Sequence, residues 1–229
     1  MAQLQVNSIL ASAVRCHTPR QFKRLLADLR SVVPYRSLAC KWGNSRTLVL
    51  TNMVDVDFPR IYLGWYFATG MCRKDPIFKE CMATQQPQMV GEVMSRLRDR
   101  FDPEYLKKLE EYGLQHGIAG GLIEGERLAY FFLIFSSDAE ASGYLGIFGK
   151  LLPALARALI ASYPYPVLTQ RKRMILQWRA HGKMPDEIAS DLSISIRTVK
   201  MHLEEIKKKL YAIDQVHAVW IGGQTGLIG

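Results

Sequence analysis

The chain has 229 residues, of which 48% are hydrophobic and 22% are charged, and its formal net charge is +9. This composition is typical of a globular protein and excludes a largely disordered chain. The length allows one large domain or two smaller ones, and no run of about 18 apolar residues predicts a membrane-spanning helix. The four cysteines have no metal-binding spacing and no secretory signal precedes them, so we expect reduced thiols in a cytoplasmic protein.

The first 163 residues combine helical and strand patterns. Apolar spacing predicts helices over residues 20–32, 59–71, 75–84, 103–112 and 144–162, and strand pairs over 37–42 with 46–51 and 118–123 with 128–135. Strands flanked by helices predict an α-β-α sandwich with a central antiparallel sheet. Two prolines in residues 164–167 forbid a continuing helix, so we expect a linker there.

Residues 168–229 predict four short helices. Thr169 and Ser195 are expected N-caps, and Pro185 suits a first helical turn. These 62 residues hold 10 Lys and Arg against 6 Asp and Glu, a net charge of +4, whereas the 167 residues before them carry +5. In the third helix, one stripe is apolar and the opposite face is cationic. This pattern predicts a helix-turn-helix that binds double-stranded DNA through its major groove and phosphates.

Short motifs follow one another through this C-terminal part: Leu168-Thr169-x-Arg171, Glu187-Ile188-Ala189 and Ile194-Ser195-x-x-Thr198-Val199-Lys200-x-His202. They resemble the signature of the LuxR-type helix-turn-helix family. The resemblance implies that Lys200, Met201 and Glu204 face base edges. It assigns Thr198, Lys207 and Lys208 to phosphates, and Arg197 is a further candidate DNA contact on this helix. Alternatively, Glu204 pairs along the helix with Lys200 or Lys208. The family usually has an acidic residue where this chain has Lys172.

A second group of motifs lies in the N-terminal part: Phe58-Pro59-x-x-Tyr62-x-x-x-Tyr66, Asp75-Pro76-Ile77 and Gly113-Leu114-x-x-Gly117. They are similar to the ligand-binding region of the acyl-homoserine lactone receptors of the same family. The resemblance implies that Asp75 accepts a hydrogen bond from a ligand amide and that Tyr66 donates one to a ligand carbonyl. Further candidate ligand contacts are Tyr62, Val90, Trp42 and Gly117. Alternatively, the two tyrosines are core residues and Asp75 is a helix N-cap.

Two of these positions depart from the family pattern. Tyr62 and Val90 both stand where the family usually has tryptophan, and Val90 in particular removes an aromatic wall. We therefore expect either an acyl-homoserine lactone-like molecule or a different small molecule, and no other cofactor and no metal.

One short helix reads few base pairs, so we expect a homodimer on a palindromic site, with residues 144–162 and the last helix as candidate contacts. RNA polymerase is a further possible partner, and no membrane partner is expected. The alternative is a ligand-independent regulator whose N-terminal domain is only a dimerisation or protein-interaction scaffold. An enzyme is not expected: the catalytic motifs of hydrolases and nucleotide-binding enzymes are absent, and nothing in the sequence orients Cys81 and His116 as nucleophile and base.

Overall fold

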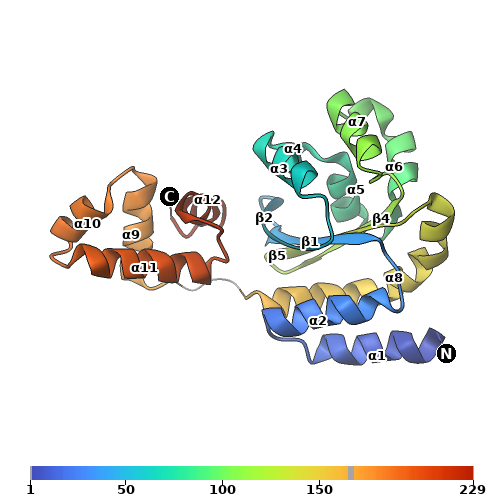
Figure 1. Ribbon diagram of the computed structural model, residues 1–229, viewed down its shortest axis with the longest axis horizontal. Helices are drawn as coiled ribbons and strands as arrows, with labels where there is room; N and C mark the ends of the chain where they lie inside the picture. Colours follow the sequence, from blue (N-terminus) through green and yellow to red (C-terminus); the bar gives the residue numbers. More distant parts are fainter. Residues whose placement is uncertain (1, 165–167, 229) are drawn as a thin grey trace. The chain divides into compact units, whose positions relative to one another are not determined.

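The computed structural model describes residues 2–164 and 168–228, so three of the four residues of the expected linker lie outside the described part. The chain divides into two compact units, Met1–Pro164 and Tyr165–Gly229. The first is built on a five-stranded sheet and the second consists of four helices (Figure 1). The architecture expected from the sequence, an α-β-α sandwich followed by a helical domain, is confirmed.

All strand pairs in the N-terminal sheet are antiparallel, and the strand order is β2-β1-β5-β4-β3. The strands are β1 (Ser37–Asn44), β2 (Val49–Val56), β3 (Gln88–Met89), β4 (Gly117–Glu124) and β5 (Arg127–Ile134). Both faces of the sheet are covered by helices (Figure 1). For this reason the central strands are buried on both sides, and alternate residues of one strand belong to different cores.

One face of the sheet is covered by α8 (Asp138–Ser162) and α2 (Pro19–Arg30), and α1 (Ala2–Val14) packs against these two helices; they are shown in blue and yellow in Figure 1. By length and composition, α8 is the one helix of the described chain that could cross a membrane. Its buried side chains, including Phe148, Leu152 and Leu155, instead pack in the core of this face. The helix therefore acts as a core helix of the domain.

The opposite face is covered by a run of shorter helices, shown in green shades in Figure 1. They are α3 (Arg60–Ala68), α4 (Met71–Lys74), α5 (Pro76–Thr84), α6 (Val90–Arg96) and α7 (Pro103–Glu111). Together with the sheet they enclose a second core that is rich in tyrosine. This second core contains most of the residues that the sequence motifs single out.

Several predicted element boundaries were wrong. The second strand begins at Val49 rather than residue 46, because the Asn44 side-chain oxygen accepts hydrogen bonds from the backbone N–H groups of Arg46 and Thr47 and holds a turn there. Helix α8 begins at Asp138, two turns before residue 144, where the Ser137 hydroxyl caps it. The first helix α1, the helix α6 and the short strand β3 were not predicted.

The C-terminal domain consists of α9 (Gln170–Ala180), α10 (Pro185–Asp191), α11 (Ile196–Lys209) and α12 (Gln215–Gln224). The expected caps are confirmed: Thr169 accepts a hydrogen bond from the Lys172 N–H and Ser195 accepts one from the Thr198 N–H. Between α10 and α11 the chain turns at Ser193, whose φ is +49°. Apolar side chains from all four helices form one core, to which α11 contributes Val199, Leu203 and Ile206.

Candidate DNA-binding helix and ligand-binding core

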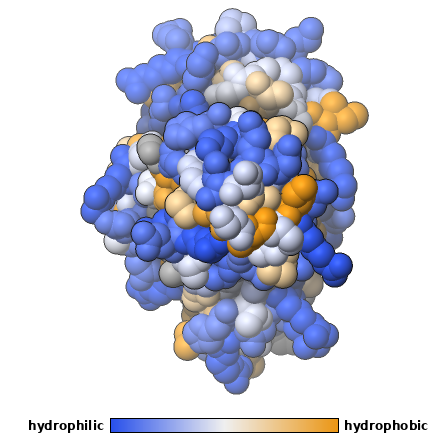
Figure 2. All heavy atoms as spheres, turned by 90° about the vertical axis from the view of Figure 1, so that its left-hand side faces the viewer, coloured by the Kyte–Doolittle hydropathy of each residue, from blue (hydrophilic) through white to orange (hydrophobic). Residues whose placement is uncertain are grey.

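Helix α11 presents its predicted DNA contacts on the face opposite its buried stripe. Five of the seven candidates are exposed, namely Arg197, Lys200, Met201, Glu204 and Lys208, and the other two, Thr198 and Lys207, are half-buried. In the space-filling view of Figure 2, the visible surface of this domain, which faces the viewer, is mostly hydrophilic, with some hydrophobic side chains among the polar ones. The geometry thus leaves a cationic helix face free to enter a groove about 12 Å wide.

Glu204 forms an ion pair along the helix, but not with either lysine that the sequence suggested. Its Oε2 lies 2.7 Å from Nζ of Lys207, which is three residues further on, so the expectation of Lys200 or Lys208 as partner was wrong. The pair is at the surface, with 52% of the Glu204 side chain exposed. An exposed pair of this kind contributes only about 0.2–0.5 kcal/mol, which a DNA contact can readily replace.

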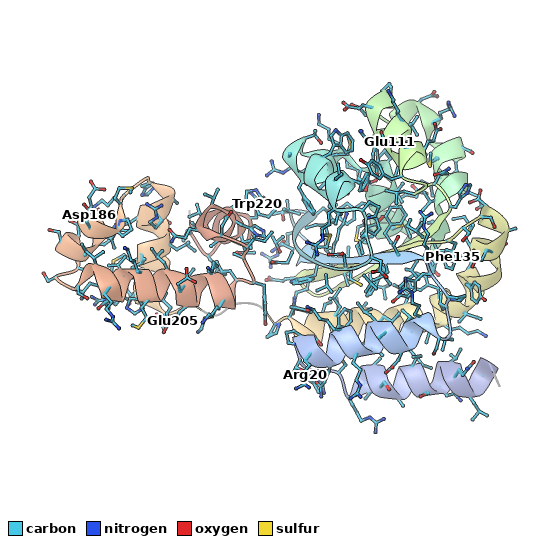
Figure 3. The ribbon with its side chains drawn as sticks, in the orientation of Figure 1. Arg20, Glu111, Phe135, Asp186, Glu205 and Trp220 are labelled. Carbon is cyan, nitrogen blue, oxygen red and sulfur yellow. The ribbon has the colours of Figure 1, made fainter. Side chains whose placement is uncertain are left out.

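Lys172, which replaces the acidic residue usual in the family, joins α9 to α11. Its Nζ lies 2.7 Å from Oε2 of Glu205, and this hydrogen bond lowers the pKa of the Glu205 carboxyl. Glu205 is labelled in Figure 3 on α11. The departure from the family pattern therefore forms an interhelical ion pair rather than leaving a charge without a partner.

We predict that the Lys172→Glu variant melts a few degrees below the wild type, because two carboxylates then face each other. The double variant Lys172→Glu/Glu205→Lys should recover most of the loss, since it restores the pair with its charges exchanged. Thermal unfolding at pH 7 and low salt measures both. Equal melting temperatures for the single and double variants would show that the pair has no role.

The ligand candidates Tyr62, Tyr66, Asp75 and Val90 all lie in the second core of the N-terminal domain and are almost fully buried. The Tyr66 hydroxyl donates a hydrogen bond of 2.7 Å to Oδ2 of Asp75. The rings of Tyr62 and Tyr66 stack with their centroids 5.7 Å apart. Burial, more than the Asp75 charge, raises the pKa of both phenols. The motif residues are thus neighbours, as the resemblance implies.

Asp75 is also the N-cap of α5. Its Oδ1 accepts hydrogen bonds from the N–H groups of Ile77 at 2.9 Å and Phe78 at 3.3 Å. With the Tyr66 hydroxyl on Oδ2, the carboxylate has three donors from the protein itself. The capping role that the sequence suggested as an alternative is therefore present in the structure.

The structure does not bring Trp42 to this core. Because side chains alternate along β1, Trp42 lies on the other face of the sheet, in the first core, and its ring stacks on Tyr163 with centroids 4.2 Å apart. Its place among the ligand contacts was wrong. Gly117 does face the tyrosine-rich core, where a Cβ would lie 2.8 Å from the Leu133 carbonyl oxygen and 3.0 Å from the Phe132 ring. Close packing of β4 on β5 thus accounts for this glycine.

The sequence interpretation missed Lys41, which is 3% exposed. It stands between Cys40 and Trp42 on β1, opposite Tyr130 on β5. Its Nζ lies 3.9 Å from the centroid of the Tyr66 ring and 5.7 Å from that of Tyr130. Burial lowers the pKa of Lys41 to about 8, although the nearby Asp75 charge acts in the opposite direction. The only signal in the sequence was a lysine within an apolar strand.

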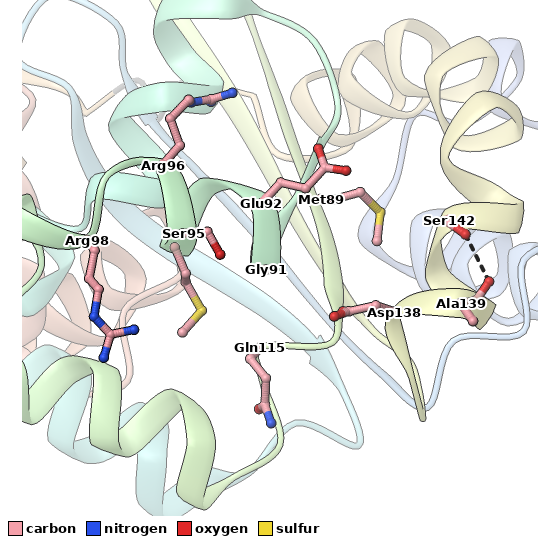
Figure 4. A pocket seen from close by; sticks show the side chains of 11 residues that line it. Met89, Gly91, Glu92, Ser95, Arg96, Arg98, Gln115, Asp138, Ala139 and Ser142 are labelled. Carbon is pink, nitrogen blue, oxygen red and sulfur yellow. Dashed lines mark hydrogen bonds between the residues drawn. The ribbon is translucent and has the colours of Figure 1, made fainter.

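A separate surface cleft of about 980 Å³ lies between α6 and the first turns of α8 (Figure 4). Its lining mixes acidic and basic side chains, including Glu92, Arg96, Arg98 and Asp138, and it also includes Gln115. None of the predicted ligand contacts lines it. Asp138 also faces His116, whose Nδ1 is 3.1 Å away, so His116 does not pair with the buried Cys81.

Comparison with known proteins agrees with this architecture. Residues 33–159 match the autoinducer binding domain model, and residues 166–221 match the model of bacterial regulatory proteins of the luxR family. The chain is 30% identical to the quorum sensing-dependent transcriptional regulator RpaR of Rhodopseudomonas palustris, over 75% of this chain and 73% of RpaR. It is 26% identical to the transcriptional activator SolR of Ralstonia nicotianae, over 93% of this chain and 95% of SolR.

Among solved structures, the fold is similar to that of CepR2 from Burkholderia cenocepacia, an N-acylhomoserine lactone-dependent transcription factor. The TM-score is 0.52 at 16% identity, over 67% of this chain and 93% of CepR2. The curated relatives are regulators of transcription and not enzymes. With both family models matching in this order, the chain belongs to the LuxR family of DNA-binding transcriptional regulators.

Proposed function

We propose that this regulator reads DNA through the exposed face of α11, with Lys200, Met201 and Glu204 at base edges. These three side chains project from one face, because Val199, Leu203 and Ile206 hold the other face in the domain core. Lysine donates to guanine, the methionine side chain offers an apolar surface, and a carboxylate can accept only from the cytosine amino group. The exposed face of α11 is the observation that carries the proposal.

Around these three residues we assign Arg197, Thr198, Lys207 and Lys208 to phosphates. Cations on a groove-facing helix neutralise phosphates and release counterions, which gives affinity without sequence preference. The Thr198 hydroxyl is 2.8 Å from that of Ser195 at the N-terminus of α11, where the helix dipole also favours an anion. The ion pair of Lys207 with Glu204 would open when each side chain meets its own DNA group.

We further propose that the protein acts as a homodimer on a palindromic site in the cytoplasm, where the bacterial chromosome is accessible to it. At the start of α12 and just before it, Val216 and Ile213 are 78% and 85% exposed, so this end of the helix offers apolar side chains that a second copy of the chain could bury. They support the last helix as one dimer contact. RNA polymerase remains a proposed partner, for which no particular surface is assigned.

The Lys200→Ala variant tests the base-reading role. We expect it to weaken binding to the selected palindrome by about 1–3 kcal/mol and to relax the preference at one base position. If Lys200 instead contacts a phosphate, binding weakens for all sequences and the salt slope falls by about 1. Selection from a randomised duplex pool, followed by titration at several salt concentrations, separates these results.

Lys23→Ala serves as the matched control, because Lys23 is an exposed lysine on α2 in the other domain. Its loss should leave the selected sequence and the affinity unchanged. If the wild-type chain selects no palindrome from the pool, the proposal of dimeric DNA reading fails.

For the N-terminal domain we propose a small-molecule ligand in the tyrosine-rich core. The match to the autoinducer binding domain model and the grouping of Tyr62, Tyr66 and Asp75 support it. A ligand-independent scaffold is the second candidate, favoured by the aromatic rings of Tyr62, Tyr66, Phe101 and Tyr105, which are buried and pack against one another in this core. Mass spectrometry of small molecules that copurify with the protein, with and without host extract, distinguishes the two.

A further inference from the structure

The tyrosine-rich core contains a positive charge without a partner. Among the residues that the structure describes, the ammonium of Lys41 forms no hydrogen bond, and no carboxylate oxygen lies within 4.0 Å of it. It contacts aromatic faces instead, those of Tyr66, Phe67 and Tyr130. The Lys41 side chain is only 3% exposed, and a cation taken out of water without an ion pair is expensive to keep in a folded protein, so its presence favours a partner that arrives from outside.

The neighbouring polar groups also lack an acceptor. The Tyr130 hydroxyl, directly across the strands from Lys41, is buried and has no hydrogen-bond partner in the described part of the chain. Asp75 already accepts three hydrogen bonds from Tyr66, Ile77 and Phe78. Three of the roughly four acceptor positions of this carboxylate are therefore occupied, whereas Lys41 and Tyr130 offer donors without an acceptor.

These free donors suit a molecule that brings an acceptor and a negative charge. A neutral lactone whose amide N–H donates to Asp75 would leave the Lys41 ammonium without a charged partner. A carboxylate beside Lys41 would form a charge-assisted hydrogen bond, reach the Tyr130 hydroxyl and neutralise the buried cation. The surrounding rings would contact an apolar or aromatic body.

We propose that Lys41 is the specificity-determining residue of the ligand site and that the ligand is a small organic carboxylate with an apolar body. This inference rests on the proposed role of the N-terminal core as a small-molecule site. To that proposed role, the inference adds the chemical class of the ligand and names Lys41 as the residue that selects for this class. DNA reading by α11 does not depend on it.

The test uses the full-length protein and three carboxylates with different apolar bodies: benzoate, 3-phenylpropanoate and octanoate. Each is paired with its primary amide, which keeps the shape and loses the charge. N-octanoyl homoserine lactone is added as the neutral lactone probe. Thermal shift finds the binders at pH 7 and calorimetry gives their dissociation constants.

We expect at least one carboxylate to raise the melting temperature while its amide does not. The Lys41→Met and Lys41→Gln variants should bind that carboxylate at least about tenfold more weakly, because the charged partner is lost. Met is close to Lys in length and is compatible with the apolar surroundings, so this variant is expected to fold. Lys79→Met, which removes an exposed lysine on α5, should bind as the wild type does.

Three results would overturn the proposal: no shift with any of the carboxylates, equal shifts with the matched amides, or unchanged carboxylate binding in both Lys41 variants. If the lactone binds and the Lys41 variants retain it, the core is a ligand site and only the assigned ligand class fails. The proposal of DNA reading is tested by a separate experiment, the selection from a duplex pool. We expect the Lys41 variants to select the same DNA sequence as the wild type.

Discussion

The Asp75→Ala variant is expected to lose about 3–5 kcal/mol of its free energy of unfolding. The substitution removes the N-cap of α5, which is worth about 1 kcal/mol. It also leaves the fully buried Tyr66 hydroxyl without its acceptor, which costs about 1–3 kcal/mol more. Finally it removes the negative charge of Asp75, which favours the charged form of the buried Lys41. Chemical denaturation of the full-length protein, followed through the first unfolding transition, measures the loss.

Asp102 provides a matched control. It too is an N-cap followed by proline, and its Oδ1 accepts a hydrogen bond of 2.9 Å from the Glu104 N–H, but it is exposed. The Asp102→Ala variant should therefore lose only about 1 kcal/mol. Equal losses in the two variants would mean that the buried bond to Tyr66 contributes nothing. If the loss in Asp75→Ala is large, reduced ligand binding by this variant could result from unfolding alone. Asp75→Asn removes the charge and keeps a side chain of the same shape, so it is the better variant for measuring ligand binding.

The Lys41→Met variant is expected to be more stable than the wild type, by about 3 kcal/mol at pH 7. In the folded protein the pKa of Lys41 is about 8, below the value near 10.4 of an unfolded chain. The unfolded state therefore binds more protons between these two values, and this group makes the wild type more stable as the pH rises from about 8 to 10.4. The advantage of Lys41→Met should shrink over the same range.

Other buried groups make the folded protein less stable, rather than more stable, as the pH rises. Burial raises the pKa of the Cys40 thiol and of the Tyr66 and Tyr130 phenols, so their contribution to stability is lost as the pH rises above their unfolded values. The difference between wild type and Lys41→Met, measured by denaturation at a series of pH values, isolates Lys41. A difference that does not change between pH 7 and 10 would show that the Lys41 ammonium is not destabilised by burial.

Much of the architecture follows from local patterns in the sequence. The first three C-terminal helices have hydroxyl or proline signals at their starts, and α11 has a regular apolar stripe, so their order and the exposed face of α11 could be predicted. In the N-terminal domain the strand pairs were found because their apolar runs are continuous. Helix α1 was missed because its polar and apolar residues are not separated into clear faces along the helix. Helix α6 is short, without a side-chain cap at its start.

The site was predictable only in part. The spacing of Tyr62, Tyr66 and Asp75 brought three true neighbours together, because two lie one turn apart on α3 and the third begins α5. The assignment of Trp42 failed because a strand buried on both faces has no polar side to mark which residues face which core. The same ambiguity concealed Lys41, since an isolated lysine in a strand ordinarily points to solvent. Only the sheet register shows that it lies opposite Tyr130.

Asp75 both caps α5 and accepts a hydrogen bond from Tyr66, and these two structural roles matter when sequences of this family are compared. A carboxylate that both starts a helix and accepts a hydrogen bond from a buried tyrosine stabilises the fold, whatever the domain senses. A descendant that lost its signal molecule would still retain the Asp-Pro pair and would still match the domain model. Retention of this aspartate is therefore poor evidence that a regulator responds to a signal.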